Sequence, residues 1–346
     1  MIKFRLMMTS VAGSLGPLNL EMMKASIPNK VWVLGVDARH DYNAENLADK
    51  FEIVPKGDDP GYLERVCYLI KKFQINLVIP CSDEEAVTLS TNRNKVEKLG
   101  AKVACAPKKS IQIMSNKLLT YNFLENKNVS VPKYKIATNL KELANCVGDF
   151  YNKYESFVIK DPIARGNRGT ILVDRKINGK VDFMGSRETH VGWSFYNKNI
   201  RSIIDDNFPK LILERLYKPA YDIDILANKG KVINLVPRER INPAGVPYQG
   251  NIIRNDEKLI KLAKKVSESF CLTWLYDLDI MTRKDGTPVV VEVNPRPSGS
   301  SVASILSGIP LYKNLLYLFE NKVSKNKYTL PAGRIVVPTL KCRVIS

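Results

Sequence analysis

Residues 289–301 read VVVEVNPRPSGSS, and polar side chains replace valines at alternate positions as this stretch ends. Alternate residues of an extended chain point to the same side, so Glu292, Asn294 and Arg296 are expected on one face. The upstream segment LYDLDIM is a second predicted strand, and the turn between the two contains an Asp-Gly hairpin signal. The hairpin is therefore expected to place Asp279 beside Glu292.

These residue types suit a divalent metal ion and the phosphate groups that it binds. Two carboxylates and an amide oxygen form a hard oxygen site, which Mg²⁺ occupies while it keeps water and phosphate ligands. Without a cation the carboxylates would repel each other, and one would tend to protonate. The guanidinium of Arg296 would meet the anion that the metal holds, because its planar fork matches phosphate or carboxylate. A surface hairpin with solvated charges is the alternative, but it fits Glu292 poorly inside a run of valines.

Two further stretches carry groups that could bind a nucleotide. In FVIKDPIARGNRGTILV, Lys160 ends an apolar strand, and a loop with Gly166 and Gly169 leads to the next strand. Such a loop can offer backbone N–H groups and positive charge to phosphates, although an ordinary flexible hairpin fits these residues equally well. In LILERLY, the backbone after Glu214 could read an adenine edge, although a surface ion pair explains these residues too. The sequence contains no Walker A motif, which disfavours a P-loop enzyme.

Alternating strands and helices must position these groups. From residue 1 to about 108, strand-length apolar runs alternate with helical patterns, which is typical of a parallel sheet with helices on both faces. Gly13, Gly16 and Asp37 echo a dinucleotide-binding fingerprint, but the full G-x-G-x-x-G is absent, which favours glycines in a tight strand-to-helix turn. A second α/β region follows to about residue 212, and the remainder is rich in strands.

Length, charge and cysteine usage narrow the class of protein. A chain of 346 residues is expected to form two or three domains, and its longest apolar runs are too short to span a bilayer. The N-terminus reads as a first strand and not as a signal peptide. Six scattered cysteines without a CxxC pair indicate a cytoplasmic protein without zinc or disulfides. The net charge of +18 suggests a nucleic-acid partner, but no basic block occurs, which favours a lysine-rich surface and a pocket for anionic substrates.

Taken together, these motifs resemble the ATP-grasp superfamily, and specifically the branch similar to the large chain of carbamoyl-phosphate synthetase. The resemblance is collinear to about residue 320, and its most specific pieces are EVNPRPSGSS and LYDLDIM. It implies an α/β fold in which a Rossmann-like pre-ATP-grasp domain precedes a two-lobed ATP-grasp fold. The implied divisions are the pre-ATP-grasp domain over 1–108, linker helices and a small lid subdomain over 109–212, and a large subdomain with the metal site over 213–346.

The resemblance also implies roles for individual residues. The expected cofactors are ATP and two Mg²⁺ ions, for which Mn²⁺ is an alternative, and the implied metal ligands are Asp279, Glu292 and Asn294. The residues implied to bind ATP are Lys117, Lys160, Gly166, Arg168, Gly169, Glu214, Arg215, Leu216 and Asp222. The residues implied to act in catalysis are Arg296 and Lys160. Ser298 and Gly299 are expected to contact the substrate.

Departures from the family pattern bear on the ligands. Ala220 stands where the family commonly has a ribose-binding glutamate, and Asp222 is the nearest substitute. The segment RINPAGVPYQG lacks the histidine that the synthetase has after Gly-Val, and Gly299 stands where the synthetase has an arginine. These losses argue against bicarbonate as the acceptor and indicate a roomier pocket for a larger carboxylic acid.

The expected reaction is ATP-dependent ligation. The γ-phosphoryl group of ATP moves to a carboxylate, and an amine then attacks the acyl phosphate to give an amide, ADP and phosphate. In PRERI, Arg238 and Arg240 share a strand face, where one or both are expected to clamp the substrate carboxylate or the oxyanion; a solvated basic edge is the alternative. The expected partners are a small carboxylic acid and an amine, with amino acids as the default, and a second copy of the chain, because the family often dimerises.

Two other functions stay open at this point. A phosphotransferase would release a phosphorylated product without ligation, and a nucleotide-dependent sensor or nucleic-acid binder would account for the net charge of +18. The complete set of Asp279, Glu292 and Asn294 favours catalysis, because a sensor would tolerate the loss of one of them.

Overall fold

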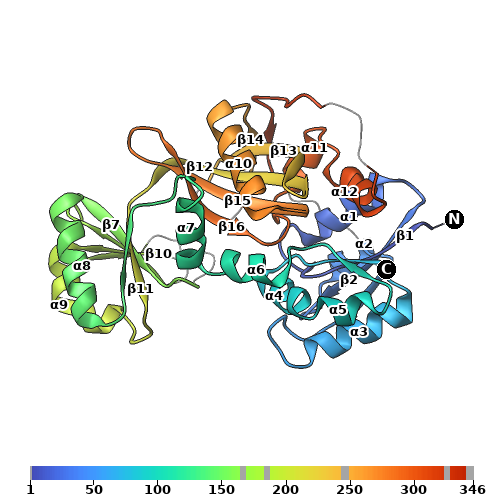
Figure 1. Cartoon of the computed structure of the whole chain (residues 1–346), viewed down its shortest axis with the longest axis horizontal. Coiled ribbons are helices and arrows are strands. Elements are labelled where there is room, and N and C mark those ends of the chain that lie inside the picture. Colours follow the sequence, from blue (N-terminus) through green and yellow to red (C-terminus); the bar gives the residue numbers. More distant parts are fainter. Residues whose placement is uncertain (1, 164–168, 183–187, 243–248, 323–327, 340–346) are drawn as a thin grey trace.

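The computed structural model describes residues 2–163, 169–182, 188–242, 249–322 and 328–339. Gly166 and Arg168, both predicted to bind ATP, lie outside the described residues. Within these ranges the chain forms three β-sheets. Figure 1 shows the second sheet at one end of the molecule, while the first and third lie together at the other. No helix of the described residues is long and apolar enough to cross a membrane.

The N-terminal sheet has five parallel strands in the order β3-β2-β1-β4-β5. Its strands are β1 (Phe4–Met8), β2 (Val31–Asp37), β3 (Lys50–Ile53), β4 (Leu77–Ile79) and β5 (Lys102–Val103). The helices between them are α1 (Gly16–Ser26), α2 (Tyr42–Leu47), α3 (Tyr62–Phe73), α4 (Asp83–Thr91) and α5 (Arg93–Glu97). The central strands are apolar runs buried along most of their length, as expected of a parallel sheet between helices. The predicted parallel α/β domain is confirmed.

The first strand-to-helix turn explains the glycine pattern of this domain. A Cβ atom on Gly16 would lie 2.1 Å from the carbonyl oxygen of Val11, so no larger residue fits the turn without a shift of the backbone. The carboxylate of Asp37 accepts hydrogen bonds from the backbone N–H groups of Ala12 at 2.8 Å and Arg39 at 3.1 Å. Gly16 and Asp37 therefore hold the turn itself, in agreement with the interpretation that the sequence favours.

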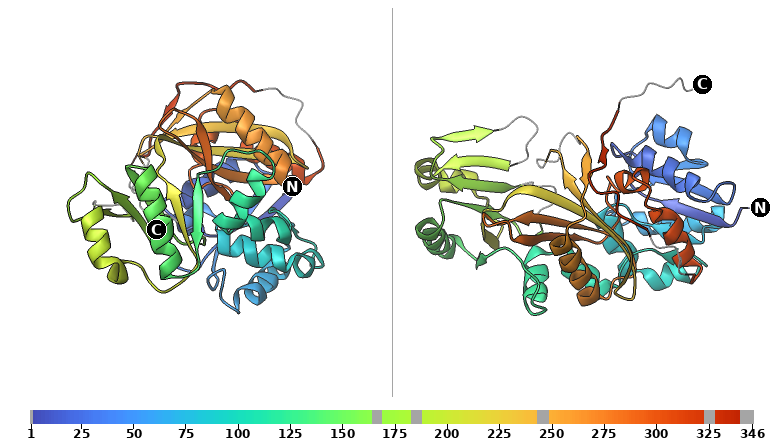
Figure 2. Two further views of the ribbon diagram at one scale, coloured as in Figure 1. Left: turned by 60° about the vertical axis from the view of Figure 1, so that its left-hand side comes forward. Right: turned by 90° about the horizontal axis from the view of Figure 1, so that it is seen from above.

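The second sheet has six strands in the order β6-β11-β7-β8-β10-β9 and its own hydrophobic core. Its strands are β6 (Tyr134–Ala137), β7 (Ser156–Lys160), β8 (Thr170–Asp174), β9 (Lys180–Asp182), β10 (Glu188–Gly192) and β11 (Lys210–Glu214). The helices α8 (Leu140–Lys153) and α9 (Trp193–Ile203) supply apolar side chains to this core. Figure 2 shows that these helices cover one face of the sheet, which leaves the other toward the rest of the molecule. Because β11 belongs to this sheet, the sheet includes residues on both sides of the predicted boundary at 212.

The third sheet has six strands in the order β16-β15-β12-β13-β14-β17. Its strands are β12 (Tyr217–Asn228), β13 (Lys231–Arg240), β14 (Asn251–Ile253), β15 (Trp274–Thr282), β16 (Pro288–Asn294) and β17 (Ile335–Val336). The remaining helices are α6 (Lys108–Met114), α7 (Lys117–Glu125), α10 (Glu257–Phe270), α11 (Val302–Leu306) and α12 (Leu311–Phe319).

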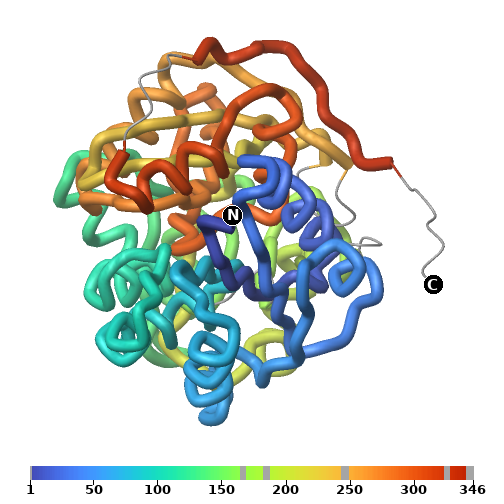
Figure 3. The backbone as a smooth tube through the Cα atoms, turned by 90° about the vertical axis from the view of Figure 1, so that its right-hand side faces the viewer, coloured from blue at the N-terminus to red at the C-terminus, as the bar shows by residue number. Residues whose placement is uncertain are grey.

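One hydrophobic core joins the first and third sheets. It includes Met7 and Leu34 from the first sheet and Ile223 and Leu278 from the third. The helices α11 and α12, which follow the last long strand, pack against α1 near the N-terminus (Figure 3). Residues 302–319 are therefore brought to the same part of the molecule as α1, and the N-terminal domain borders the strands that carry the predicted metal ligands.

Candidate active site

The strands β15 and β16 form the predicted antiparallel hairpin. Asp279 pairs with Glu292, and Asp277 pairs with Asn294 in the same register. The expected cross-strand placement of Asp279 beside Glu292 is confirmed. The sheet order adds a third acidic residue to this hairpin. Strand β12 lies on the other side of β15, and its Asp222 pairs with Asp279.

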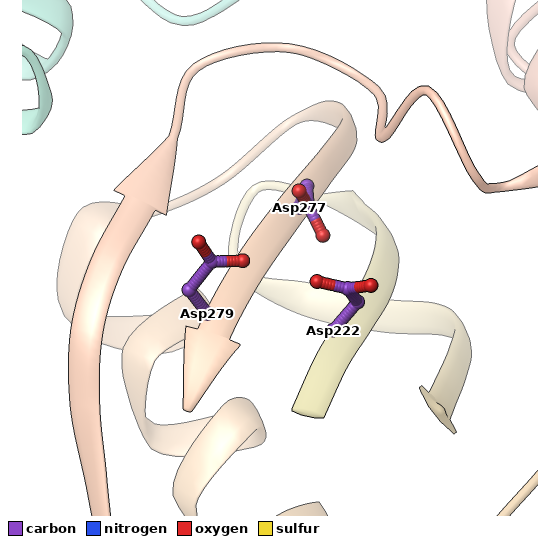
Figure 4. Close-up of side chains that lie close together, drawn as sticks. All are labelled: Asp222, Asp277 and Asp279. Atoms are coloured by element: carbon purple, nitrogen blue, oxygen red, sulfur yellow. The ribbon is translucent and has the colours of Figure 1, made fainter. Parts of the chain in front are cut away.

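Three carboxylates meet where β12 and β15 run side by side. Asp222, Asp277 and Asp279 each offer an oxygen atom, and these atoms all lie within 4.8 Å of one another (Figure 4). Burial raises the pKa of Asp277 well above its usual range, and it raises the pKa of Asp279 to about 6 although Arg240 beside it favours the ionised form. Burial also opposes ionisation of Asp222, but Arg240 and Arg238 outweigh it and lower the pKa of Asp222 to about 2.

Sequence reasoning assigned only Asp279 of this cluster to the metal. Asp277 was not predicted as a site residue, and Asp222 was predicted to bind ATP as a substitute for the ribose-binding glutamate. The signal in the sequence is the alternation of Asp222 with Asp224 on one strand and of Asp277 with Asp279 on another. Alternation puts both members of each pair on one face, but only the sheet order brings the two strands together.

Basic side chains already contact two of the predicted metal ligands. Nζ of Lys117 lies 2.9 Å from Oε1 of Glu292. Arg240 donates from Nε to Asp222 at 2.6 Å and from Nη2 to Asp279 at 2.7 Å. Burial opposes ionisation of Glu292, but Lys117 leads the positive charges that outweigh it and lower its pKa. The predicted metal ligands Glu292 and Asp279 each pair with a basic side chain in this structure.

Two lysines predicted to bind phosphates converge from different parts of the chain. Lys160 ends β7 of the second sheet, whereas Lys117 begins α7, which packs on β16 of the third. Burial and, after it, the charge of Lys117 together lower the pKa of Lys160 to about 8, against the opposing effect of Glu292. The positive charges of both lysines act at Glu292, so the structure brings together a carboxylate and two ammonium groups that were predicted separately.

Arg296 lies between two acidic side chains, one from each neighbouring domain. Its Nε lies 3.2 Å from Oδ1 of Asp83 in α4, and its Nη1 lies 3.5 Å from Oδ2 of Asp277 in β15. These carboxylates raise the pKa of Arg296 above its ordinary value although burial opposes its charge. Asp83 is a site residue that sequence reasoning missed, because no local pattern connects α4 of the first domain with a loop of the third sheet.

The predicted adenine-binding segment, residues 214–216, is held in place by contacts of its own side chains. Oε1 of Glu214 accepts hydrogen bonds from the backbone N–H of Lys133 at 2.8 Å and from Nε of Arg283 at 2.9 Å. Arg215 contacts Asp174 at 2.5 Å. Leu216 is half-buried beside them. The Glu214 carboxylate thus fixes the segment between the second and third sheets, and contact with adenine stays a prediction for its backbone.

The residues predicted to hold the substrate fall into two groups. The side chain of Arg238 is 0% exposed, and its guanidinium bonds to Asp224 at 2.9 Å and to Oγ of Ser300 at 2.6 Å. This enclosure is typical of a structural ion pair, and contact between Arg238 and the substrate stays a prediction. Arg240 is 27% exposed at the acidic cluster and keeps access to solvent.

Residues 297–301, which follow Arg296 and are called the serine loop below, are anchored to α1. Ser298 is buried, and its Oγ lies 3.1 Å from that of Ser300. The carbonyl oxygen of Gly299 accepts a hydrogen bond from Nδ2 of Asn19 at 2.7 Å. Gly169, the described part of the predicted phosphate-binding loop, has φ +67° immediately before β8. The roles of Ser298, Gly299 and Gly169 in binding stay predictions.

Comparisons with known proteins agree with this architecture. Residues 207–340 match a family model described as an ATP-grasp in the biosynthetic pathway with the Ter operon. Residues 18–104 match the PylC-like N-terminal domain. A comparison with curated protein sequences finds no match.

Several solved structures have the same fold. N5-carboxyaminoimidazole synthetase from Staphylococcus aureus, complexed with ADP, is 13% identical with a TM-score of 0.70, over 95% of this chain and 81% of that one. An L-amino acid ligase from Bacillus licheniformis is 14% identical with a TM-score of 0.63, over 91% and 74%. The biotin carboxylase domain of the 2-oxoglutarate carboxylase from Hydrogenobacter thermophilus is 13% identical with a TM-score of 0.67, over 94% and 71%. At these identities the likeness shows a shared fold across nearly the whole chain.

Proposed function

Because the chain belongs to the ATP-grasp superfamily, we propose that it is a ligase that activates a carboxylic acid with ATP and joins it to an amine. The γ-phosphoryl group moves to the carboxylate, and the amine then displaces phosphate from the acyl phosphate to form an amide. The observation that carries this proposal is the convergence of Glu292, Lys117 and Lys160, from three separate elements, in one site whose two lysines are buried. Opposite charges at such a site suit a polyphosphate and its cations.

The residues present fit the two Mg²⁺ ions, or Mn²⁺ in their place, that the family implies. Asp279 and Glu292 offer carboxylate oxygens, and Asn294 donates its N–H to Asp277 at 3.1 Å, which leaves its own oxygen for a cation. Bound there, the metal ions neutralise charge on the β- and γ-phosphates of ATP. Asp279, Glu292 and Asn294 are the ligands that we propose.

The lysines and Arg296 supply the remaining positive charge. Lys117 and Lys160 hold phosphate oxygens as protonated ammonium groups, and their approach from different domains orients the nucleotide between the second and third sheets. Arg296, held by Asp83 and Asp277, presents a fixed guanidinium to the transferred phosphoryl group. The second domain closes over this site, which excludes the water that would hydrolyse an acyl phosphate.

We propose that Arg240, and not the enclosed Arg238, binds the carboxylate of the substrate. Arg240 keeps an exposed edge beside Asp279, where its planar fork matches a carboxylate. Ser298 and Gly299 border the same loop as Arg296 and line the acceptor side of the site. The L-amino acid ligase among the structural relatives supports an amino acid as one of the two substrates.

The test is a screen for ADP release with Mg²⁺, ATP and pools of carboxylic acids and amines. A ligase releases ADP only when an acid and an amine are both present, and mass spectrometry then detects the amide. Glu292→Gln is expected to reduce this release by about a thousandfold, because it removes both a metal ligand and the partner of Lys117. ATP binding without ADP release for any acid–amine pair would contradict the proposal.

A phosphotransferase is the second candidate within the same site. It would release ADP with the acid alone, and a stable phosphorylated product would accumulate without an amine. The presence or absence of amine dependence therefore decides between the two reactions.

A further inference from the structure

The acidic cluster contains more oxygen ligands than the predicted metal set uses. Asp222 from β12 and Asp277 and Asp279 from β15 turn their carboxylates toward one another across the strand pair (Figure 4). Only Asp279 belongs to the set formed with Glu292 and Asn294. The other two carboxylates lie together with it in the third sheet, and neither is a metal ligand in the proposed ATP site; Asp277 there only positions Arg296 and Asn294.

One buried carboxylate oxygen of the cluster, Oδ1 of Asp277, has no hydrogen-bond partner among the described residues. The side chain of Asp277 is 4% exposed, and its Oδ2 accepts a hydrogen bond from Asn294 at 3.1 Å. Its Oδ1 is buried and has no hydrogen-bond partner among the residues that the structure describes. A buried carboxylate oxygen without a partner is unfavourable unless a cation or a donor meets it. A metal ion bound between the three carboxylates would supply the partner that Oδ1 lacks.

A guanidinium occupies part of this position in the structure. Arg240 bridges Asp222 and Asp279, with donor distances of 2.6 Å and 2.7 Å. Its side chain is 27% exposed, so it can move toward solvent, whereas the 0% exposed Arg238 cannot. Arg240 therefore pairs with two of the three carboxylates, and its single positive charge offsets only part of theirs. It is partly exposed, whereas Arg238 is fully enclosed.

We propose that Asp222, Asp277 and Asp279 form a divalent-cation site of their own, in which Arg240 holds the place of the metal ion until the ion displaces it. The inference rests on the proposed function only in that Asp279 is shared with the ATP-bound metals. Once displaced, the guanidinium of Arg240 is free to bind the carboxylate of the acid substrate. Cation binding and acid binding then strengthen each other, because coupling between two ligands is reciprocal.

The experiment is a titration of the full-length protein with Mn²⁺ in the absence of nucleotide, followed by electron paramagnetic resonance and by calorimetry. Arg240→Met is expected to bind Mn²⁺ about tenfold more tightly than the wild type, because the competing guanidinium is gone. Arg240→Lys, which keeps the charge with a shorter reach, is expected to lie between them. The matched control is Arg254→Met, since Arg254 pairs with Glu239 at 2.7 Å outside the cluster and is 41% exposed. Circular dichroism confirms that each variant is folded.

A second set of variants separates this site from the ATP-bound metals. In the Arg240→Met background, Asp222→Asn and Asp277→Asn are each expected to cancel the gain in Mn²⁺ affinity. Glu292→Gln in the same background is expected to retain the gain, although it loses MgATP binding. Equal or weaker Mn²⁺ binding by Arg240→Met would overturn the inference, and so would loss of the gain with Glu292→Gln but not with Asp222→Asn. Failure of the ligase proposal appears separately, as absence of ADP release, and leaves the Mn²⁺ result standing.

Discussion

Asp83 of the N-terminal domain lies 3.2 Å from Nε of Arg296, so the first domain contributes a charged side chain directly to the candidate active site. Asp277 contacts the same guanidinium at 3.5 Å from the opposite side. A guanidinium held by two carboxylates from different domains has a fixed orientation, which depends on how the domains pack. The N-terminal domain is thus part of the catalytic apparatus that we propose, in addition to any role in binding substrate.

Asp83→Asn is expected to lower turnover about tenfold while it leaves the KM for ATP nearly unchanged, because it loosens Arg296 without removing it. The measurement is steady-state ADP release with the acid and amine that the screen identifies. The control is Asp285→Asn, in the exposed turn of the hairpin. If Asp83 acts through Arg296, Asp83→Asn adds little to the loss caused by Arg296→Ala. Additive losses would show instead that Asp83 acts by another route.

Nucleotide binding is expected to take up a proton above pH 8. Burial and Lys117 lower the pKa of Lys160 to about 8, so its amine is mostly neutral at pH 9 in the free protein. Bound phosphates favour the charged form and raise this pKa, so ATP affinity falls as the pH rises through 8. Calorimetry at pH 8.5 in two buffers of different ionisation enthalpy measures the proton uptake. Lys160→Met should abolish it; unchanged uptake in that variant would assign the proton to another group.

Arg238→Met is expected to destabilise the fold by about 3–5 kcal/mol, because it leaves the buried carboxylate of Asp224 without its charge partner. Urea unfolding followed by circular dichroism measures the free energy of unfolding. The exposed Arg254→Met change serves as the control and should cost less than about 1 kcal/mol. A variant of native stability that has lost acid binding would instead restore Arg238 to the substrate-binding role predicted from the sequence.

Asn19 is expected to hold the serine loop against α1. Its amide donates to the carbonyl oxygen of Gly299 at 2.7 Å and accepts from the hydroxyl groups of Tyr312 at 2.6 Å and Ser301 at 3.2 Å. Asn19→Ala removes all three hydrogen bonds and leaves the Ser301 and Tyr312 hydroxyl groups only their mutual contact at 3.3 Å. It is expected to lower the free energy of unfolding by about 1–3 kcal/mol. Tyr312→Phe removes only one of the bonds and should cost less. An Asn19→Ala loss no larger than that of Tyr312→Phe would contradict a joint anchoring role.

Much of the site followed from local sequence rules. The two-residue period of a strand and the Asp-Gly turn fixed which side chains of the β15–β16 hairpin face one another, and Asp279 does pair with Glu292. The alternation of strands and helices gave the parallel N-terminal domain, and Gly16 and Asp37 proved to hold a turn. These features depend on residues that are close along the chain, so periodicity and turn chemistry are enough to predict them.

The tertiary structure alone decided which distant residues share the site. Asp222 meets Asp279 because β12 lies beside β15, and Arg240 meets both because β13 comes next; nothing in a strand's own pattern specifies that order. Arg238 and Arg240 share a strand face and look equivalent in sequence, but the serine loop covers only the first of them. Asp83 reaches Arg296 through the packing of two domains. Side-chain periodicity fixes the face of each strand, whereas neighbours and burial arise only when the sheets and domains assemble.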